Sequence, residues 1–440
     1  MKFVSTRNPE AEAVSFGEAM FRGLAPDGGL YHPVDDADLR ALIRSFGDDM
    51  SFVDLAGALI QGLFPETHDA ASARELALRA FPFSPELKEL EPGIQLLELF
   101  HGPSCAFKDF GASFLAAAME RDLAVRGEHA VILTATSGDT GSAVAQAFHG
   151  RENIDVVILY PSGRVSPLQE QQLTTLGGNV LALEVEGSFD DCQRMVKEAF
   201  ANRDLDGRVN LTSANSINVG RLIPQSFYYV YAFAQLKEQP SDELVFVVPS
   251  GNFGNLTAGV LAWRWGMPVS EFVAATNAND VVPEYLATGV FNPRPSLRTL
   301  ANAMDVGNPS NFERLQAMFA GGMLDINSLI SGVAVSDGVI AETMRDVWEH
   351  HGELICPHTA TGVYAARQRL ARERGGNVNL VALATADAAK FIEVSREAVG
   401  VEPPIPERLA RLMDLPKQAL LVEPTVERLA AILLERFADR

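Results

Sequence analysis

The sequence predicts an α/β protein built on mostly parallel sheets. Apolar runs rich in Val, Ile and Leu alternate with amphipathic stretches over roughly 300 residues, the alternation that parallel sheets with crossover helices produce. Several runs are apolar at successive positions, so helices are expected to cover both faces of each sheet. Because ligands of such sheets bind beyond the carboxyl ends of the strands, functional loops are expected directly after strands.

Each expected element follows from its own local pattern. Residues 1 to about 90 are expected to be mainly helical, with turns at PDGG (26–29) and FPFSP (81–85). The expected strands are the apolar runs at residues 130–136, 155–161, 179–185, 243–249, 271–276 and 379–385. The expected helices between them are the amphipathic stretches at residues 189–203, 218–239 and 339–352.

The length of 440 residues exceeds what one hydrophobic core usually supports. We therefore expect an N-terminal domain at residues 1–90 and a core of two interleaved α/β subdomains at residues 91–400. A C-terminal helical segment at residues 401–440 completes the chain. Its two amphipathic helices are expected to cap the fold or to pack on a partner subunit, so both a monomer and a homodimer fit the sequence.

Composition excludes several classes of function. The formal net charge of −21 argues against nucleic acid and anionic membranes as partners, and it means that local donors must hold any anionic ligand. The N-terminus lacks the apolar region of a signal peptide, and no apolar run is long enough to span a bilayer. Cys105, Cys192 and Cys356 form no CxxC pair, which favours a reducing, cytoplasmic location. No HExxH motif is present, and no metal site is expected.

Two glycine-bearing loops follow expected strands. PSGNFGN (249–255) places Gly251 and Gly254 at a helix start, where aligned backbone N–H groups bind phosphate, although a plain strand-to-helix turn would have the same pattern. TSGDTG (136–141) adds the hydroxyl donors Ser137 and Thr140, whereas its carboxylate, Asp139, repels an anion and also suits a helix N-cap.

Lys108 lies in HGPSCAFKDF (101–110) between Phe107 and Phe110. An exposed lysine or an ion pair with Asp109 would be the ordinary interpretation. A partly desolvated lysine has a lowered pKa, however, and can form a Schiff base with a carbonyl compound. If that compound is pyridoxal phosphate, one glycine loop would bind its phosphate and the other would be left for an anionic substrate group.

The segment HGPSCAFKDFGASF around Lys108 resembles the lysine segment of threonine synthases, which are pyridoxal-phosphate enzymes of the tryptophan-synthase-β-like fold (fold type II). The resemblance covers nearly the whole chain, and the segment GLAPDGGLY is similar to the longer branch of the family, which has an additional N-terminal domain. The other matching segments are STRNP (5–9), GLAPDGGLY (23–31), ILTATSGDTGSAVA (132–145), ILYPSG (158–163), SPLQEQQ (166–172), SANSINVGR (213–221), PSGNFGN (249–255), AATNANDVVP (274–283), AMDVGNPSNFER (303–314), PHTATGV (357–363) and LATADAAKF (383–391).

The resemblance implies a fold of two mostly parallel sheets flanked by helices, with a helical N-terminal domain, and pyridoxal 5'-phosphate as the cofactor. It implies that Lys108 carries the cofactor through a Schiff base and that Thr385 faces the pyridine nitrogen. Asp139 is expected near the phenolic oxygen of the cofactor. The residues expected to bind the cofactor phosphate are Gly251, Asn252, Phe253, Gly254 and Asn255.

The implied reaction converts O-phospho-L-homoserine and water to L-threonine and phosphate, the last step of threonine biosynthesis. Asn215, Asn218 and Arg221 follow one another at helical spacing, so they are expected to reach one pocket, although helix caps and an ion-paired arginine are alternatives. The residues expected to bind the phosphate and carboxylate of the substrate are Ser137, Thr140, Asn215, Asn218 and Arg221. Asn277 and Asn279 belong to a matching segment without an assigned role.

The chain departs from the family pattern at two places. Asp387 and Ala388 replace the usual His-Pro pair, and Cys356 replaces a usual acidic residue. Both changes lie where the resemblance places the wall of the cofactor-ring site. Two alternatives therefore stay open: another enzyme of the same fold, of the dehydratase or cysteine-synthase type, and a catalytically silent relative that binds pyridoxal phosphate.

Overall fold

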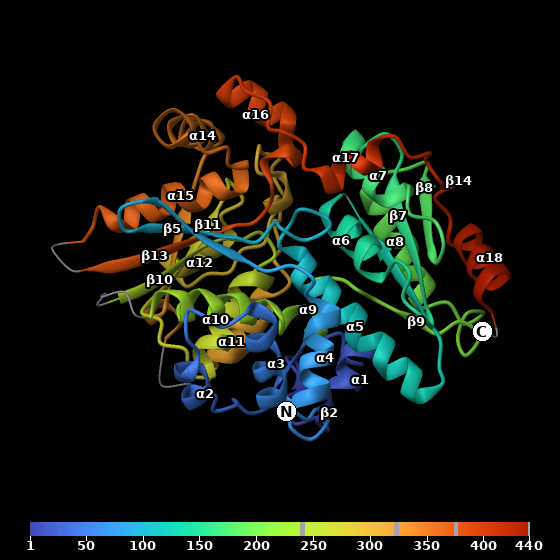
Figure 1. Ribbon diagram of the computed structural model, residues 1–440. Helices are drawn as coiled ribbons and strands as arrows, with labels where there is room; N and C mark the ends of the chain where they lie inside the picture. Colours follow the sequence, from blue (N-terminus) through green and yellow to red (C-terminus); the bar gives the residue numbers. More distant parts are fainter. Residues whose placement is uncertain (137, 238–242, 321–324, 374–376, 439–440) are drawn as a thin grey trace.

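Two mostly parallel sheets form the core of the computed structural model (Figure 1), which describes residues 1–136, 138–237, 243–320, 325–373 and 377–438. The larger sheet has six strands, in which only the edge pair β4–β5 is antiparallel. Its order is β12 (Ile330–Ala334), β11 (Glu271–Thr276), β10 (Glu243–Pro249), β13 (Val378–Ala384), β5 (Ile94–Glu98) and β4 (Glu86–Glu91). The second sheet is parallel throughout, in the order β14 (Ala419–Val422), β8 (Val180–Val185), β7 (Ile154–Pro161), β6 (Ala130–Ala135) and β9 (Leu211–Thr212).

All six strands expected from the sequence are present, each with ends within one residue of the prediction. Strand β7 is buried along its whole length, as a strand covered on both faces must be. The sequence also did not predict β5, of five residues, and β9, of two residues. It likewise did not predict β4, which is rich in charged residues, or β12, which contains a glycine. Neither pattern resembles a continuous apolar strand.

The expected helices are present, with one break. The structure has α8 (Phe189–Phe200) and α14 (Asp337–His351), as predicted. The helix predicted at residues 218–239 is instead divided at Pro224 into α9 (Val219–Leu222) and α10 (Gln225–Leu236). Proline lacks the backbone N–H that would continue the helix, so the break follows from Pro224. Residues 238 and 239 lie outside the described part of the chain.

The C-terminal segment is not only helical. Between the predicted helices α17 (Glu407–Met413) and α18 (Val426–Phe437), β14 adds a parallel strand to β8. The expectation of helices alone missed β14 because a four-residue strand between two helices gives almost no periodic signal.

The N-terminal residues also contain more than helices. The helices are α1 (Phe16–Arg22), α2 (Arg40–Ser45), α3 (Phe52–Leu63) and α4 (Ala70–Ala80). A small antiparallel sheet, which the sequence did not predict, joins β1 (Lys2–Ser5), β2 (Val14–Ser15) and β3 (Tyr31–Pro33). Carbonyl groups of this region accept hydrogen bonds from the core: Asn218 Nδ2 donates to Met20 O at 2.8 Å and Thr212 Oγ1 to Phe21 O at 2.7 Å.

The remaining helices cover the two sheets (Figure 1). They are α5 (Lys108–Arg126), α6 (Asp139–Phe148), α7 (Pro167–Thr174), α11 (Gly254–Arg264), α12 (Val281–Thr288), α13 (Phe312–Phe319), α15 (Pro357–Leu370) and α16 (Ile392–Val399), with 3-10 turns η1 (Asn302–Met304), η2 (Ile326–Ser328) and η3 (Ala388–Phe391). Within the described ranges, no helix combines the length and the apolar character that crossing a membrane requires.

Candidate active site

Lys108 begins α5 directly after an irregular loop, and its side chain is only 17% exposed. The loop is fixed to the end of β13, because Phe107 N donates to Thr385 O at 2.9 Å and Asp387 N donates to Cys105 O at 3.1 Å. The Lys108 ammonium lies 5.6 Å from the centre of the Phe107 ring. Lys108 is therefore held next to the carboxyl end of β13, in the larger sheet.

Asp139 is the carboxylate that faces Lys108. It begins α6, after strand β6 of the other sheet, and its Oδ2 lies 3.5 Å from Lys108 Nζ. Its Oδ1 lies 2.8 Å from Lys390 Nζ and accepts a hydrogen bond from Gln169 Nε2 at 3.2 Å. Two ammonium groups thus share one buried carboxylate: both lysines follow strands of the six-stranded sheet, whereas Asp139 follows the five-stranded sheet.

The charges in this cluster shift one another's pKa. Burial lowers the pKa of Lys108; Asp139 opposes this shift, while Lys390 and Arg221 reinforce it. Burial would raise the pKa of Asp139, but Lys390 and Lys108 outweigh burial and hold the pKa of this carboxyl far below its usual value. The imidazole of His358, on α15, also faces the cluster, and burial lowers its pKa to about 4. The site therefore contains a buried amine that loses its proton more readily than an exposed lysine does.

The PSGNFGN loop joins β10 to α11. Among the described residues, no protein group accepts a hydrogen bond from the backbone N–H of Gly251, Asn252, Phe253, Gly254 or Asn255. Five neighbouring donors at a helix N-terminus fit a phosphate group. The left-handed conformation in this loop belongs to Phe253 (φ 61°), which packs at 6.4 Å from the Phe312 ring.

The two glycines of this loop are not equivalent. A Cβ on Gly251 would lie 2.6 Å from Met304 Cα, so the neighbouring backbone excludes a side chain there. A Cβ on Gly254 would lie 3.4 Å from Asn311 Nδ2, the end of a side chain. The amides of Asn252 and Asn255 hold the loop itself: Asn252 Nδ2 donates to Ser216 Oγ at 2.8 Å and Asn255 Nδ2 to Pro249 O at 2.9 Å.

The TSGDTG loop turns around a buried hydroxyl that the sequence analysis did not single out. Thr136 Oγ1 accepts hydrogen bonds from Gly138 N at 3.0 Å and Gly141 N at 2.9 Å. Gly138 has a φ of +146°, and a Cβ there would lie 2.5 Å from the Gln169 side chain. Thr140 is partly exposed in the first turn of α6, next to Asp139. Ser137 lies outside the described residues.

Arg221 is a buried guanidinium that forms no ion pair with a carboxylate in the described part of the chain. It is 2% exposed, its Nη1 donates to Ala214 O at 2.8 Å, and its Nε has no hydrogen-bond partner within the described structure. Asp109 is the carboxylate that partly stabilises its charge, yet burial lowers the pKa of Arg221 to about 10. α5 approaches closely, since a Cβ on Gly111 would lie 2.7 Å from Arg221 O. A buried cation that is only partly compensated, beside the Lys108 cluster, fits an anionic ligand.

The helical spacing predicted for Asn215, Asn218 and Arg221 is wrong, because α9 begins only at Val219. Asn218 is the helix N-cap, with Oδ1 accepting from Gly220 N at 2.8 Å and Nδ2 donating to Met20 O and Ser213 O. This pattern favours the capping interpretation for Asn218. Asn215 lies against β6, where its Oδ1 accepts from Thr134 Oγ1 at 3.0 Å.

The two departures from the family pattern are both helix caps. Cys356 is the N-cap of α15, with its Sγ accepting from Thr359 N at 3.4 Å, and Asp387 caps η3 by accepting from Ala389 N at 2.9 Å. Ala388 is buried in η3. The buried Thr385 stands just beyond β13, beside the Lys108 loop. Both caps therefore shape the segments that carry His358 and Lys390.

Sequence analysis missed both Lys390 and His358, although each lies in a quoted segment. A lysine at this position has no local signal of burial, and only the fold brings it to Asp139. Asn277 and Asn279, in contrast, hold the loop around Asp305, to which their Nδ2 atoms donate at 2.8 and 3.2 Å.

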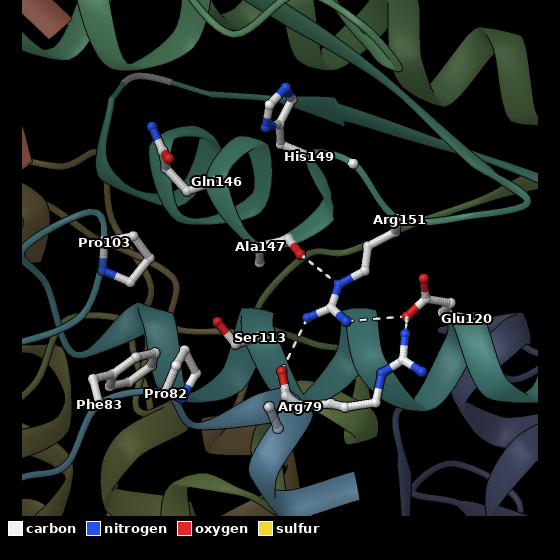
Figure 2. Close-up of a pocket in the computed structure, with 12 residues that line it drawn as sticks. Arg79, Pro82, Phe83, Pro103, Ser113, Glu120, Gln146, Ala147, His149 and Arg151 are labelled. Carbon is white, nitrogen blue, oxygen red and sulfur yellow. Dashed lines mark hydrogen bonds and ion pairs between the residues drawn. The ribbon is translucent and has the colours of Figure 1, made fainter.

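A cavity of about 270 Å³ lies along α5, apart from this cluster (Figure 2). None of the predicted site residues lines it. Its charged groups bind one another: Glu120 Oε2 accepts from Arg79 at 2.6 Å and from Arg151 at 3.0 Å. These ion pairs join α4, α5 and the end of α6.

Comparisons with known proteins agree over the whole chain. Models of the threonine synthase N terminus, of pyridoxal-phosphate dependent enzymes and of the threonine synthase C-terminal region match residues 2–81, 80–386 and 359–433. The threonine synthase of Haemophilus influenzae is 42% identical over 440 residues, which cover 99% of this chain and 100% of the relative. That of Escherichia coli is 41% identical over 406 residues, covering 92% of this chain and 93% of the relative.

Solved structures give the same result. A crystal structure of the Escherichia coli threonine synthase has a TM-score of 0.89 at 38% identity, covering 99% of this chain and 100% of that one. A pyridoxal-phosphate-bound threonine synthase from Brucella melitensis has a TM-score of 0.91 at 36% identity, covering 99% of both chains. The predicted fold class is confirmed, and the chain belongs to the threonine synthase family of pyridoxal-phosphate-dependent enzymes.

Proposed function

We propose that this protein is a threonine synthase, a carbon–oxygen lyase that converts O-phospho-L-homoserine and water to L-threonine and phosphate, the last step of threonine biosynthesis. The observation that carries the proposal is that a buried amine, Lys108, lies near a buried guanidinium, Arg221, which forms no ion pair among the described residues. A buried charge is costly unless it is paired and hydrogen-bonded, so a guanidinium whose Nε has no partner among the described residues supports an anion-binding site.

The cofactor in this proposal is pyridoxal phosphate, which supplies an electron sink for negative charge developing on substrate carbon atoms. Lys108 would hold it covalently, and the free backbone donors of residues 251–255 would bind its phosphate. Thr385 would face the pyridine nitrogen. Asp139, which stays ionised between two ammonium groups, would orient Lys108 near the phenolic oxygen.

The protein's own residues then divide the work of proton transfer and recognition. The Lys108 amine, once free, would act as the general base at the α carbon, because burial lowers its pKa and so favours the neutral amine. Arg221 would hold the phosphate of the substrate through two N–H groups of its fork. Ser137, Thr140 and Asn215 stay proposed substrate contacts, whereas the bonds of Asn218 favour a structural role.

We also propose a cytoplasmic location, in line with three free and buried cysteines. The division into residues 1–90, 91–400 and 401–440 is proposed as the domain organisation. A monomer and a homodimer are both compatible with the proposed activity.

The direct test follows phosphate and L-threonine during incubation of the purified protein with O-phospho-L-homoserine. We expect the two products in equal amounts and a visible absorbance band from the bound cofactor. Lys108→Ala should abolish turnover and covalent attachment, and borohydride reduction of the parent should label Lys108, whereas the surface variant Lys88→Ala should retain both.

Other outcomes would identify the alternatives. Deamination of serine or threonine without phosphate release would mean a dehydratase. A bound cofactor with no turnover would mean a silent relative, and a label on another lysine would refute the assignment of Lys108.

The phosphate loop predicts different effects for its two glycines. Gly251→Ala should weaken pyridoxal phosphate binding by about tenfold or more, because overpacking of a fixed site costs about 1–3 kcal/mol and Met304 Cα stands 2.6 Å from the new Cβ. Gly254→Ala should change the dissociation constant far less. Equilibrium dialysis measures the dissociation constant of pyridoxal phosphate. If both variants raise it equally, or if Gly251→Ala leaves it unchanged, the cofactor phosphate binds elsewhere.

Arg221 predicts a separation of substrate recognition from cofactor binding. Arg221→Met removes the charge with little loss of volume, so kcat/KM for O-phospho-L-homoserine should fall roughly ten- to a hundred-fold, the effect of about 1.5–3 kcal/mol. Product inhibition by inorganic phosphate should weaken in parallel, while the visible cofactor band stays intact. Arg221→Lys should recover part of the loss, because it keeps the charge but not the fork. Loss of the cofactor, or unchanged phosphate inhibition, would contradict this role.

A further inference from the structure

Lys390 is an ammonium group with no access to solvent: the exposed fraction of its side chain is 0%. Among the described residues, its ammonium group contacts Asp139 Oδ1 at 2.8 Å and Ser104 O at 2.8 Å. Burying a lysine charge is expensive unless an ion pair and hydrogen bonds compensate it. Both contacts of Lys390 are made with the immediate surroundings of Lys108, since Ser104 belongs to the loop that precedes it.

The two lysines compete for one carboxylate. Lys390 takes the shorter contact with Asp139, at 2.8 Å, whereas Lys108 lies 3.5 Å from the other oxygen. Lys108 is thereby left loosely paired, which suits an amine that must bind a cofactor and release it again.

We propose that Lys390 is a positioning residue, which occupies Asp139 and so prevents this carboxylate from holding Lys108 in a tight ion pair. The proposal deepens the proposed function, because it concerns the availability of the Lys108 amine for pyridoxal phosphate. Lys390 acts through Asp139 and is not assigned a contact with the substrate.

The charge of Lys390 is what matters, because its hydrogen bond is duplicated. Ser104 O also accepts from Gln172 Nε2 at 3.2 Å, so a neutral side chain already ties down this carbonyl. Gln172 therefore provides a matched control, because its removal takes one hydrogen bond from Ser104 O without changing any charge.

The groups that face Lys108 set the direction of the expected effect. They are Asp139 from α6, Lys390 from η3, Arg221 from α9 and the neutral imidazole of His358 from α15. Without Lys390, Lys108 loses a repulsive neighbour, and Asp139 is free to pair with it. Both changes favour the charged form of Lys108, so its pKa must rise.

The experiment measures how fast the full-length protein, freed of cofactor, takes up pyridoxal phosphate at a series of pH values. Uptake requires the neutral amine, and its rate is followed through the visible band of the bound cofactor. Lys390→Met should move the midpoint of this pH profile upward by about one unit or more, the usual effect of an opposite charge at this distance. Gln172→Met should leave the midpoint where it is in the parent.

The variant Asp139→Asn tests the direction of the shift in the midpoint independently. It removes the carboxylate and keeps Lys390, so the midpoint should move downward, and this variant keeps the test decisive if Lys390→Met does not fold. An unchanged midpoint in Lys390→Met, an equal shift in Gln172→Met, or an upward shift in Asp139→Asn would overturn the proposal. Because the readout is cofactor uptake, a failure here is distinct from failure to turn over O-phospho-L-homoserine.

Discussion

The ion pairs of the buried Asp139 carboxylate with Lys390 and Lys108 are the interactions on which the rest of the site depends. Asp139 comes from α6, after the five-stranded sheet, and it binds Lys390, which follows the six-stranded sheet. This contact therefore joins the two sheets. Removing one partner of a buried ion pair costs about 3–5 kcal/mol. Because the two lysines match the charge of Asp139, Arg221 is left without an ion-pair partner among the described residues. Around Lys108, the interior of this chain therefore carries positive charge although the net charge of the chain is −21.

Backbone constraints place Lys108 in this field. Arg408, from α17, donates to Cys105 Sγ at 2.8 Å and to the carbonyl groups of Phe100 and His101, both at 3.0 Å. Cys105 itself has a left-handed φ of 57°. The loop before Lys108 is therefore fixed by side chains from distant parts of the sequence, and the C-terminal segment is one of its supports. The same reasoning gives the N-terminal region a role, since its carbonyl groups anchor the segment around Asn218.

The sequence was informative where one local pattern decides the structure, and not where the tertiary fold decides it. Strands buried on both faces and a lysine between aromatic residues carry their signal in the sequence itself. Lys390 has no such signal, because nothing near it indicates that its side chain meets Asp139 far away in the chain. The left-handed residue of the PSGNFGN loop is Phe253 and not a glycine, since packing against Phe312 overrides the local preference. Likewise, Pro224 ended a helix that the apolar periodicity continued.

The most direct measurement of the central claim is a crystal structure of the cofactor-bound protein soaked in inorganic phosphate. If Asp139 is neutralised by Lys390 and leaves Arg221 for an anion, the cofactor phosphate should lie on the backbone N–H groups of residues 251–255. A separate phosphate ion should then bind the Arg221 guanidinium, while the contact between Lys390 and Asp139 is retained. A phosphate ion bound away from Arg221, or Asp139 turned to pair with Arg221 in place of Lys390, would contradict the account.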